Sequence, residues 1–308
     1  MKSRKSNLTK YITLKAQNLL AITATVALIS SATGSVTIDY VIIGNAGNTA
    51  DPLTGFGAVD YEYKIGKYEV TNAQYGAFLN AAAKTDSYGL YNSEMSSYGI
   101  TQSGSSGNYT YNVTTALANR PVVYVSWFDA ARFANWMMNG QGSGSTETGA
   151  YALNGAISGI VLKNAGAQVY IPSEDEWYKA AYYNAVNQTY SLYPNGQNTI
   201  STINANYGSG ASTDVGTYSS DPSTFGTFDQ GGNVWELNDA VISVSSCVLR
   251  GGGWASYYDG LLSSHRNIDN NSTTEAYGTG FRLAAVPEPS SLLVTMLASC
   301  MMLIRRKR

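Results

Sequence analysis

The spacing of hydrophobic residues predicts three short helices in the first two thirds of the chain. Each begins at a Ser or Thr that can cap the helix: Thr71 in "EVTNAQYGAFLNAAAK", Ser126 in "VSWFDAARFANWMM" and Ser173 in "IPSEDEWYKAAYY". After each cap, apolar side chains recur every three or four residues, as on the buried face of an amphipathic helix. The expected inward-facing positions are Tyr75, Phe78, Leu79, Ala82, Phe133, Ala134, Met137, Trp177, Ala180 and Ala181.

Short runs of β-branched and aromatic residues predict strands in residues 61–70, 121–126, 246–252 and 280–285. The Gly- and Ser-rich segments 101–112 and 139–149 resemble exposed insertions. The expected fold class is α+β, with helices concentrated in the first half and a loop-rich second half. No internal repeat divides the chain, so one domain of about 250 residues is expected between the two ends.

Both ends of the chain have the character of targeting segments. Five basic residues precede the apolar run "LLAITATVALI", and small residues follow it, which predicts a signal peptide over 1–34, removed by signal peptidase. At the other end, "VPEPSSLLVTMLASCMMLIRRKR" resembles the PEP-CTERM sorting signal of bacterial envelope proteins, which implies processing by an exosortase over 286–308. A retained C-terminal membrane anchor is the alternative, and either tail places the domain 35–285 in the exported cell envelope or outside the cell.

The domain between these segments is acidic. The ends contain nine of the 19 Lys and Arg residues but only one of the 21 Asp and Glu residues, which leaves ten basic against twenty acidic residues. This charge disfavours nucleic acid as a partner and suits a cation. Cys300 lies in the tail, so Cys247 is the single cysteine of the domain and no internal disulfide is expected.

Six ordered motifs resemble the formylglycine-generating enzyme family, also called the sulfatase-modifying-factor family. They are "YKIGKYEVTNAQYGAFL", "RPVVYVSWFDAARFANWM", "YIPSEDEWYKAAYY", "GGNVWEL", "VLRGGGW" and "GFRLA". The resemblance covers about residues 59–285 and implies a variant of the C-type-lectin-like fold, with few regular elements and long loops.

The oxidase branch of that family binds copper through two cysteines five residues apart, and here those positions hold Ser256 and Leu261. Neither side chain can replace a thiolate, so no copper is expected and formylglycine generation is disfavoured. A non-haem-iron sulfoxide synthase, the other enzymatic branch, needs several histidines, whereas His265 is the only one in the chain. The leading hypothesis is a lectin-like binding or structural module; the alternative is an oxidoreductase of either branch.

The resemblance also implies a structural Ca²⁺ site in "DQGGNVWEL". The carboxylates of Asp229 and Glu236, and the main-chain carbonyls of Gly232 and Val234, would be the ligands, since calcium prefers oxygen donors. Half of a second site is suggested by Asn206 and Tyr207 in "NANYGSG". A turn with a core tryptophan is the alternative interpretation of the first motif.

Between "RGGGW" and "GFR", the related fold presents its ligand-facing surface, as in the variable proteins of diversity-generating retroelements. Tyrosine, serine and asparagine make adaptable contacts at low entropic cost. Arg250 and Arg282, by contrast, are expected to brace the fold by pairing with carboxylates. The ligand would be a glycan, a protein or a matrix polymer, and the expected binding residues are Trp254, Ser256, Tyr257, Tyr258, Asp259, His265, Arg266 and Asn267.

Overall fold

The computed structural model describes residues 35–243 and 246–287, so the predicted signal peptide and most of the C-terminal tail lie outside the described residues. The chain separates into two units, 1–35 and 36–308, and the fold below belongs to the second. Its α-helices are α2 (Asn72–Ala82), α3 (Trp127–Met138) and α4 (Glu174–Tyr182), and its 3₁₀ helices are η1 (Ser93–Ser97), η2 (Thr115–Leu117) and η3 (Tyr258–Leu261).

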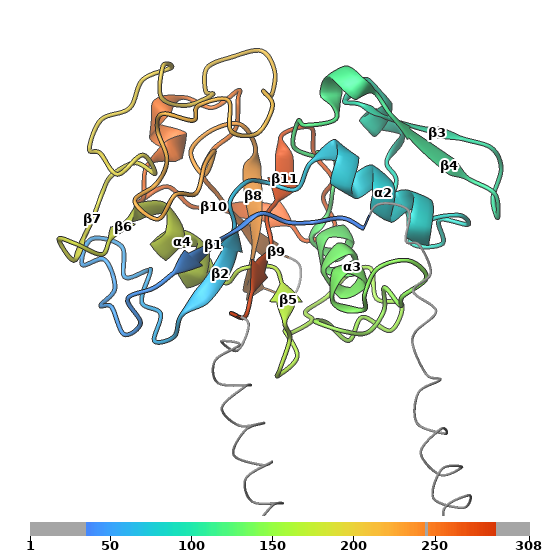
Figure 1. The fold of residues 1–308 in the computed structure, drawn as a ribbon, viewed down its shortest axis with the longest axis horizontal. Helices are drawn as coiled ribbons and strands as arrows, with labels where there is room; N and C mark the ends of the chain where they lie inside the picture. Colours follow the sequence, from blue (N-terminus) through green and yellow to red (C-terminus); the bar gives the residue numbers. More distant parts are fainter. Residues whose placement is uncertain (1–34, 244–245, 288–308) are drawn as a thin grey trace, which may run out of the picture. The chain divides into compact units, whose positions relative to one another are not determined.

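Two four-stranded sheets form the centre of this unit (Figure 1). The first has the order β1-β2-β12-β5, with β1 (Tyr40–Ile43), β2 (Tyr63–Gly66), β12 (Ala284–Ala285) and β5 (Val169–Tyr170). In the second, the order is β10-β9-β8-β11, with β10 (Asn267–Asn271), β9 (Ser246–Arg250), β8 (Trp235–Ser243) and β11 (Thr279–Phe281). β8 and β9 are antiparallel, while β11 runs parallel to β8.

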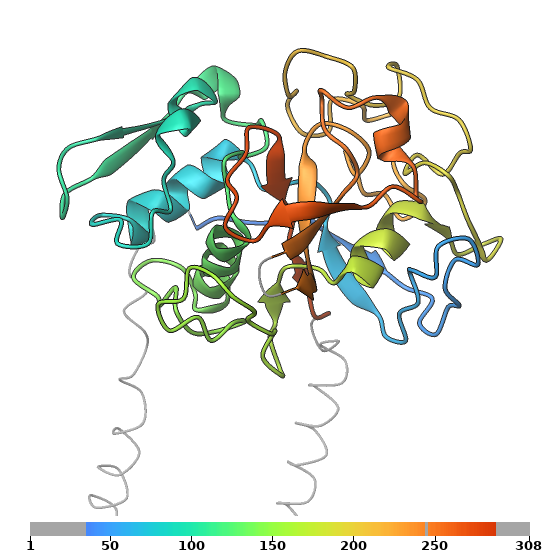
Figure 2. The same ribbon diagram turned by 180° about the vertical axis from the view of Figure 1, so that it is seen from behind.

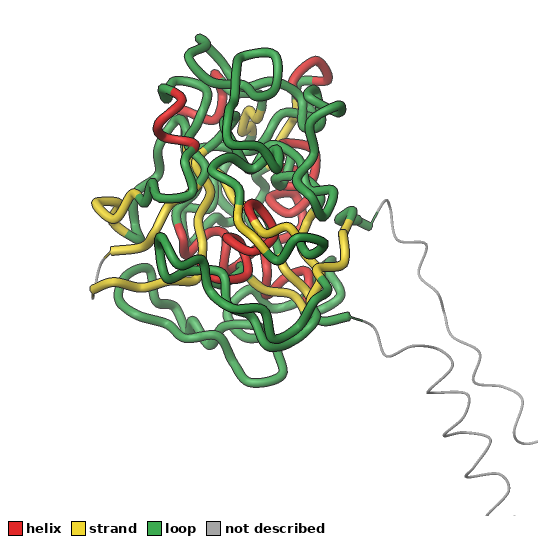
Figure 3. Tube along the Cα trace, turned by 90° about the vertical axis from the view of Figure 1, so that its left-hand side faces the viewer, coloured by secondary structure: helices red, strands yellow, loops and turns green. Residues whose placement is uncertain are grey.

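Helices lie on both sides of these central strands. α4 is on one side and α2 and α3 on the other, as the two opposite views agree (Figure 2). Two small hairpins complete the regular structure: β3 (Ile100–Ser103) with β4 (Thr110–Val113), and β6 (Tyr183–Asn184) with β7 (Thr189–Tyr190). Loops make up most of the remaining trace (Figure 3), and the fold class is α+β as expected. Within the described ranges, no helix is long and apolar enough to cross a membrane.

All three predicted helices are confirmed, together with their caps. Thr71, Ser126 and Ser173 are the N-caps, and each forms a capping box with the residue three positions later. Most of the predicted inward-facing side chains are buried, with Ala82 and Met137 partly exposed. Because a capping box satisfies two backbone donors that the first helical turn leaves unpaired, these local sequences define where each helix begins.

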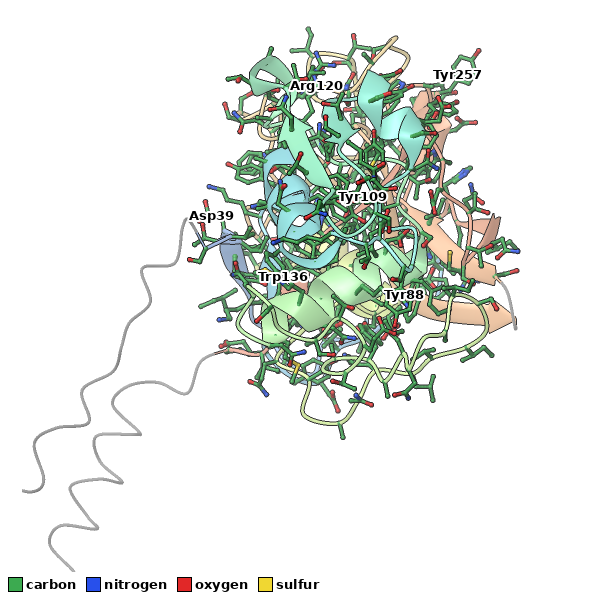
Figure 4. The ribbon with its side chains drawn as sticks, turned by 90° about the vertical axis from the view of Figure 1, so that its right-hand side faces the viewer. Asp39, Tyr88, Tyr109, Arg120, Trp136 and Tyr257 are labelled. Atoms are coloured by element: carbon green, nitrogen blue, oxygen red, sulfur yellow. The ribbon has the colours of Figure 1, made fainter. Side chains whose placement is uncertain are left out.

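An aromatic cluster joins α2 and α3 to the second sheet. The rings of Phe78 and Phe133 meet edge to face at 5.4 Å, and Phe133 meets Phe281 of β11 in the same way at 5.5 Å. Trp136 completes the cluster against Phe78 and is marked on α3 in Figure 4. Aromatic contacts of this kind add to the stability gained by burying the rings.

The expected strand over 121–126 is wrong. Its apolar residues Val122, Val123 and Val125 are buried, but the segment forms only an isolated bridge, between Pro121 and Thr71. The backbone of Tyr124 is left-handed, with φ of 60°, so the segment cannot continue a regular ladder. The predicted segments 61–70, 246–252 and 280–285 each contain a strand. Eight of the described strands had not been expected: β1, β3, β4, β5, β6, β7, β8 and β10.

The cap of α3 leads to a prediction about pH. Asp129 is 3% exposed, and burial raises the pKa of its carboxyl to about 7, although hydrogen bonds from Ser126 favour the charged form. Between the ordinary pKa near 4 and this raised value, the folded state binds more protons than the unfolded state. We therefore expect the free energy of unfolding to fall by roughly 2–4 kcal/mol as the pH rises from 4 to 8.

Urea unfolding across that pH range measures the effect. Asp129→Asn cannot titrate and should show a smaller decline, while Glu94→Gln, at an exposed position, should behave as the wild type. Equal pH dependence in the wild type and Asp129→Asn would contradict the prediction.

Candidate ligand-binding cleft

A glycine turn after β9 starts the candidate site. Gly251 and Gly252 have φ of 91° and 72°, in the region that side chains rarely adopt. A Cβ on Gly251 would lie 2.5 Å from the carbonyl oxygen of Gln230, so the two backbones can approach only because this residue has no side chain. The residues that follow this turn, beginning with Gly253 and Trp254, lie at the end of the second sheet.

There the chain forms an open cleft of about 190 Å³. The ends of β8, β9, β10 and β11 and the loops between them contribute to it, so its floor is a sheet and its sides are loops. The lining residues are Trp235, Leu249, Gly253, Trp254, Ala255, Ser256, Asn267, Ala276, Tyr277, Gly278 and Thr279.

Aromatic rings dominate the cleft. Trp254 lies between two tyrosines: its ring centre is 5.8 Å from that of Tyr277 and 6.2 Å from that of Tyr98, with the latter pair stacked. Trp254 is nearly buried, whereas Tyr277 is 51% exposed. On the other side, the ring of Trp235 lies 5.4 Å from the ring of His265.

The structure brings together only some of the predicted binding residues. Trp254, Ser256 and Asn267 line the cleft, and His265 contacts its Trp235. The exposed Tyr257, at the surface in Figure 4, Tyr258 and Asp259 are not among the lining residues.

Eight of the eleven lining residues were not predicted from the sequence, among them Trp235, Tyr277 and Thr279. Trp235 is inside the motif that was assigned to calcium, and Tyr277 and Thr279 directly precede the "GFR" motif. Two signals in the sequence pointed to these residues. For Trp235 it was the alternation of side chains along β8, and for Tyr277 it was the position between two predicted strands.

Arg266 forms an ion pair beside the cleft, and its role in ligand binding stays a prediction. Its Nε and Nη2 donate to Glu174 Oε1 and Oε2 at 2.7 and 2.6 Å. The same carboxylate accepts a hydrogen bond from Nε of the fully buried Arg250 at 2.8 Å. Arg250 also donates to the carbonyl oxygens of Ser263 and His265, which fixes the loop beside the cleft. The bracing role expected for Arg250 is thereby confirmed.

The two positions that correspond to the copper-binding cysteines differ in environment. Ser256 lies in the cleft, and its hydroxyl oxygen accepts a hydrogen bond from the Gly253 amide at 2.9 Å. Leu261 is fully buried against Tyr193 and Ala205. Neither side chain carries a soft donor, and Cys247, the one cysteine that the structure describes, is buried on β9.

Glu236 has a different environment from the one that a calcium ligand requires. Its Oε1 and Oε2 accept hydrogen bonds from Arg282 Nη2 and Nε, both at 2.6 Å, and Oε2 also accepts one from Trp177 Nε1 at 2.8 Å. Both side chains of the ion pair are fully buried. The expected bracing role of Arg282 is confirmed, and the role of Glu236 as a calcium ligand stays a prediction.

The other predicted calcium ligands already have partners within the fold. Asp229 Oδ2 accepts a hydrogen bond from the Gly216 amide at 2.6 Å, and Gly232 is a left-handed glycine with φ of 88° whose amide donates to the Gly251 carbonyl. The Asn206 side-chain amide donates to the Ala211 carbonyl, and Tyr207 packs in a separate cluster. Among the described residues, no three His, Cys, Asp or Glu side chains are grouped to hold a metal ion. A site made of two carboxylates and the main-chain carbonyls of Gly232 and Val234 stays a prediction.

Three carboxylates lie near Arg282: Glu69 and Glu236 are buried, and Asp229 is partly exposed. Burial, followed by the charge of Asp229, raises the pKa of Glu69 well above its usual value, and burial raises the pKa of Asp229 to about 6. The guanidinium favours the charged forms of Glu69 and Asp229 against this effect, and it pairs directly with Glu236. The Asn233 amide donates to Glu69 Oε1, which ties this charged cluster to the turn before β8.

Comparison with known proteins agrees with this architecture. Residues 35–286 match the model of the sulfatase-modifying factor enzyme 1-like domain. Variable protein 1 of Treponema denticola superposes with a TM-score of 0.56 at 21% identity, over 82% of this chain and 97% of that one. The crystal structure of CarF gives 0.57 at 21% identity, over 82% and 100% of the two chains. No curated protein sequence matches. The fold is therefore of the C-type-lectin-like type found in this group.

Proposed function

This chain belongs to the sulfatase-modifying factor enzyme 1-like domain family, and from that premise we propose that it is a binding module rather than an oxidase. The observation that carries the proposal is the cleft itself. At the place where the oxidase branch is expected to hold two thiols, this chain has an open, aromatic-lined depression with Ser256 on its wall and Leu261 buried outside it. Concave sites lined by aromatic side chains with a few placed polar groups are typical of ligand binding.

The rigid surroundings of the cleft support the same proposal. The glycine turn, the Glu174–Arg250 ion pair and the sheet ends hold the lining residues in place before any ligand arrives. A preorganised site loses less entropy on binding than a flexible one. No Asp, Glu, Lys, Arg, His or Cys side chain is among the described residues that line the cleft, and Tyr277 is the one titratable side chain among them.

We further propose that the module acts in the exported cell envelope. The apolar N-terminal run after basic residues and the Pro-Glu-Pro tail support export by signal peptidase and sorting by an exosortase. The acidic balance of the domain suits a surface that does not bind nucleic acid. Structural calcium remains part of this proposal through family resemblance, with Asp229, Gly232, Val234 and Glu236 as the ligands that the resemblance implies.

An assay for oxidase chemistry tests the choice between a binding module and an oxidase. Full-length protein is incubated with Cu(I), oxygen and a cysteine peptide derived from a sulfatase, with a copper-dependent formylglycine-generating oxidase as the positive control. We expect neither stoichiometric copper uptake nor the aldehyde product in mass spectra, because two thiolates are needed for the metal. Oxygen-dependent aldehyde formation by this chain would contradict the proposal and favour the oxidoreductase alternative.

A further inference from the structure

We propose that the cleft binds an uncharged saccharide, one hexose-sized ring at a time, as part of a larger glycan. This inference rests on the proposed binding function and adds the class of ligand. It follows from three properties of the lining: flat aromatic surfaces, neutral polar groups and the absence of charge among the lining residues.

The aromatic surfaces suit the shape of a sugar ring. A pyranose presents C–H groups on its two faces, and these pack favourably against the electron-rich face of an aromatic ring. Tyr277, which is half-exposed, and the partly exposed Trp235 supply ring surface to the cleft, while the buried Trp254 packs against Tyr277 and supports it. Two rings in the same lining allow a sugar ring to contact more than one aromatic side chain.

Neutral polar side chains stand beside the rings. Ser256, Asn267 and Thr279 line the same cleft. The Ser256 oxygen already accepts the Gly253 amide hydrogen, which leaves its hydroxyl hydrogen to be donated. Hydroxyl and amide groups can both donate and accept hydrogen bonds, which matches the hydroxyl groups at the edge of a sugar ring.

The lack of charged side chains in the lining disfavours charged small ligands. None of the eleven lining residues is Asp, Glu, Lys, Arg or His. The neighbouring Arg266 is held by Glu174, so it does not extend a countercharge into the cleft. A phosphate, carboxylate or ammonium group would lose water there without gaining an opposite charge, which costs several kcal/mol.

Size indicates a single ring. The cleft measures about 190 Å³, below the roughly 300–1,000 Å³ of pockets that enclose drug-sized ligands. Its open side allows a chain of sugars to continue along the surface. There the exposed Tyr257 and Tyr258 of the η3 segment lie outside the cleft proper.

Binding is tested with the full-length protein and defined oligosaccharides. Tryptophan fluorescence and calorimetry are followed during titration with neutral probes (hexasaccharides of β-glucan, α-glucan and mannan). Oligogalacturonate is the acidic probe, and an unstructured Tyr- and Asn-rich peptide represents a protein ligand. We expect saturable binding of at least one neutral probe and none of oligogalacturonate.

The matched variants locate the site. Tyr277→Ala, at a half-exposed position, should weaken neutral-saccharide binding about tenfold or more, and Tyr277→Phe should retain it because the ring remains. Tyr61→Ala, 46% exposed and outside the cleft, should bind as the wild type does. Melting curves check that each variant is folded.

Each outcome supports or overturns the inference. Failure of all neutral probes to bind, or binding that Tyr277→Ala leaves unchanged, overturns it. Peptide or oligogalacturonate binding that Tyr277→Ala abolishes also overturns the saccharide inference, but it leaves the proposed binding function standing. Aldehyde formation in the copper assay is the separate result that would remove the proposed function itself.

Discussion

Replacing Arg282 with methionine is expected to lower the free energy of unfolding by about 3–5 kcal/mol. The guanidinium is fully buried, pairs with Glu236 through two hydrogen bonds of 2.6 Å, and donates to the carbonyl oxygens of Gly66 and Phe228. Methionine fills similar space but leaves the buried Glu236 without its countercharge and removes the positive charge near Glu69 and Asp229. Those groups must then take up protons or remain charged in a medium of low polarity, and both raise the free energy of the fold.

Urea unfolding at pH 7 measures this loss, with Lys84→Met, an exposed position, as the control that should change stability by less than about 0.5 kcal/mol. A loss below about 1 kcal/mol in Arg282→Met would mean that the ion pair contributes little beyond a hydrophobic replacement.

The variant Glu236→Gln distinguishes between two roles of Glu236, as the ion-pair partner of Arg282 and as a calcium ligand. If Glu236 serves Arg282, the variant loses stability equally in calcium and in chelator. A loss that occurs in calcium alone would restore Glu236 as a calcium ligand and contradict the arrangement described above.

The second large effect is expected from Glu174→Gln, at about 3 kcal/mol. A single carboxylate binds both Arg250 and Arg266, and Arg250 is fully buried. Glutamine cannot neutralise either guanidinium, and its amide nitrogen would point a donor at another donor. The lost charge therefore leaves two cations side by side.

Hydrogen exchange adds a spatial test to the unfolding measurement. Because Arg250 holds the carbonyl oxygens of Ser263 and His265, Glu174→Gln should speed amide exchange in the loop between η3 and β10 more than in α3. The control Glu94→Gln, at an exposed position of η1, should leave both regions unchanged. Uniform acceleration across the whole domain would indicate global destabilisation without a local role for the ion pair.

Local signals made the helices predictable. Thr71, Ser126 and Ser173 bind backbone groups three residues away, so a short window of sequence contains the whole interaction. β8 was harder because its centre holds Asn238 and Asp239, residue types that are uncommon in strands, and it gains stability from partners distant in sequence.

The cleft was predictable only in part for a related reason. Trp254, Ser256 and Asn267 follow the glycine turn and could be placed by motif, whereas Tyr277 joins them only after β11 pairs with β8. The partners of Arg266 and Glu236, which are Glu174 and Arg282, were not predicted because they lie 92 and 46 residues away. When two partners are this far apart in sequence, their spacing does not show which buried carboxylate will pair with which guanidinium.

The order of the first sheet determines how the domain carries a pulling force. β1 and β12 both pair antiparallel with the intervening β2, so the first and last strands of the described domain point the same way. Tension between the two chain ends therefore runs along these strands, and their cross-strand hydrogen bonds resist it together rather than one after another. β12 is also held by β5, and the amide of Val286 binds the Gln168 carbonyl just before the chain leaves the sheet. If the domain is tethered through its C-terminal end, force loads in shear the hydrogen bonds between β12 and its neighbours β2 and β5. The lifetime of the folded domain under force would then depend on how quickly β12 slides out of the sheet.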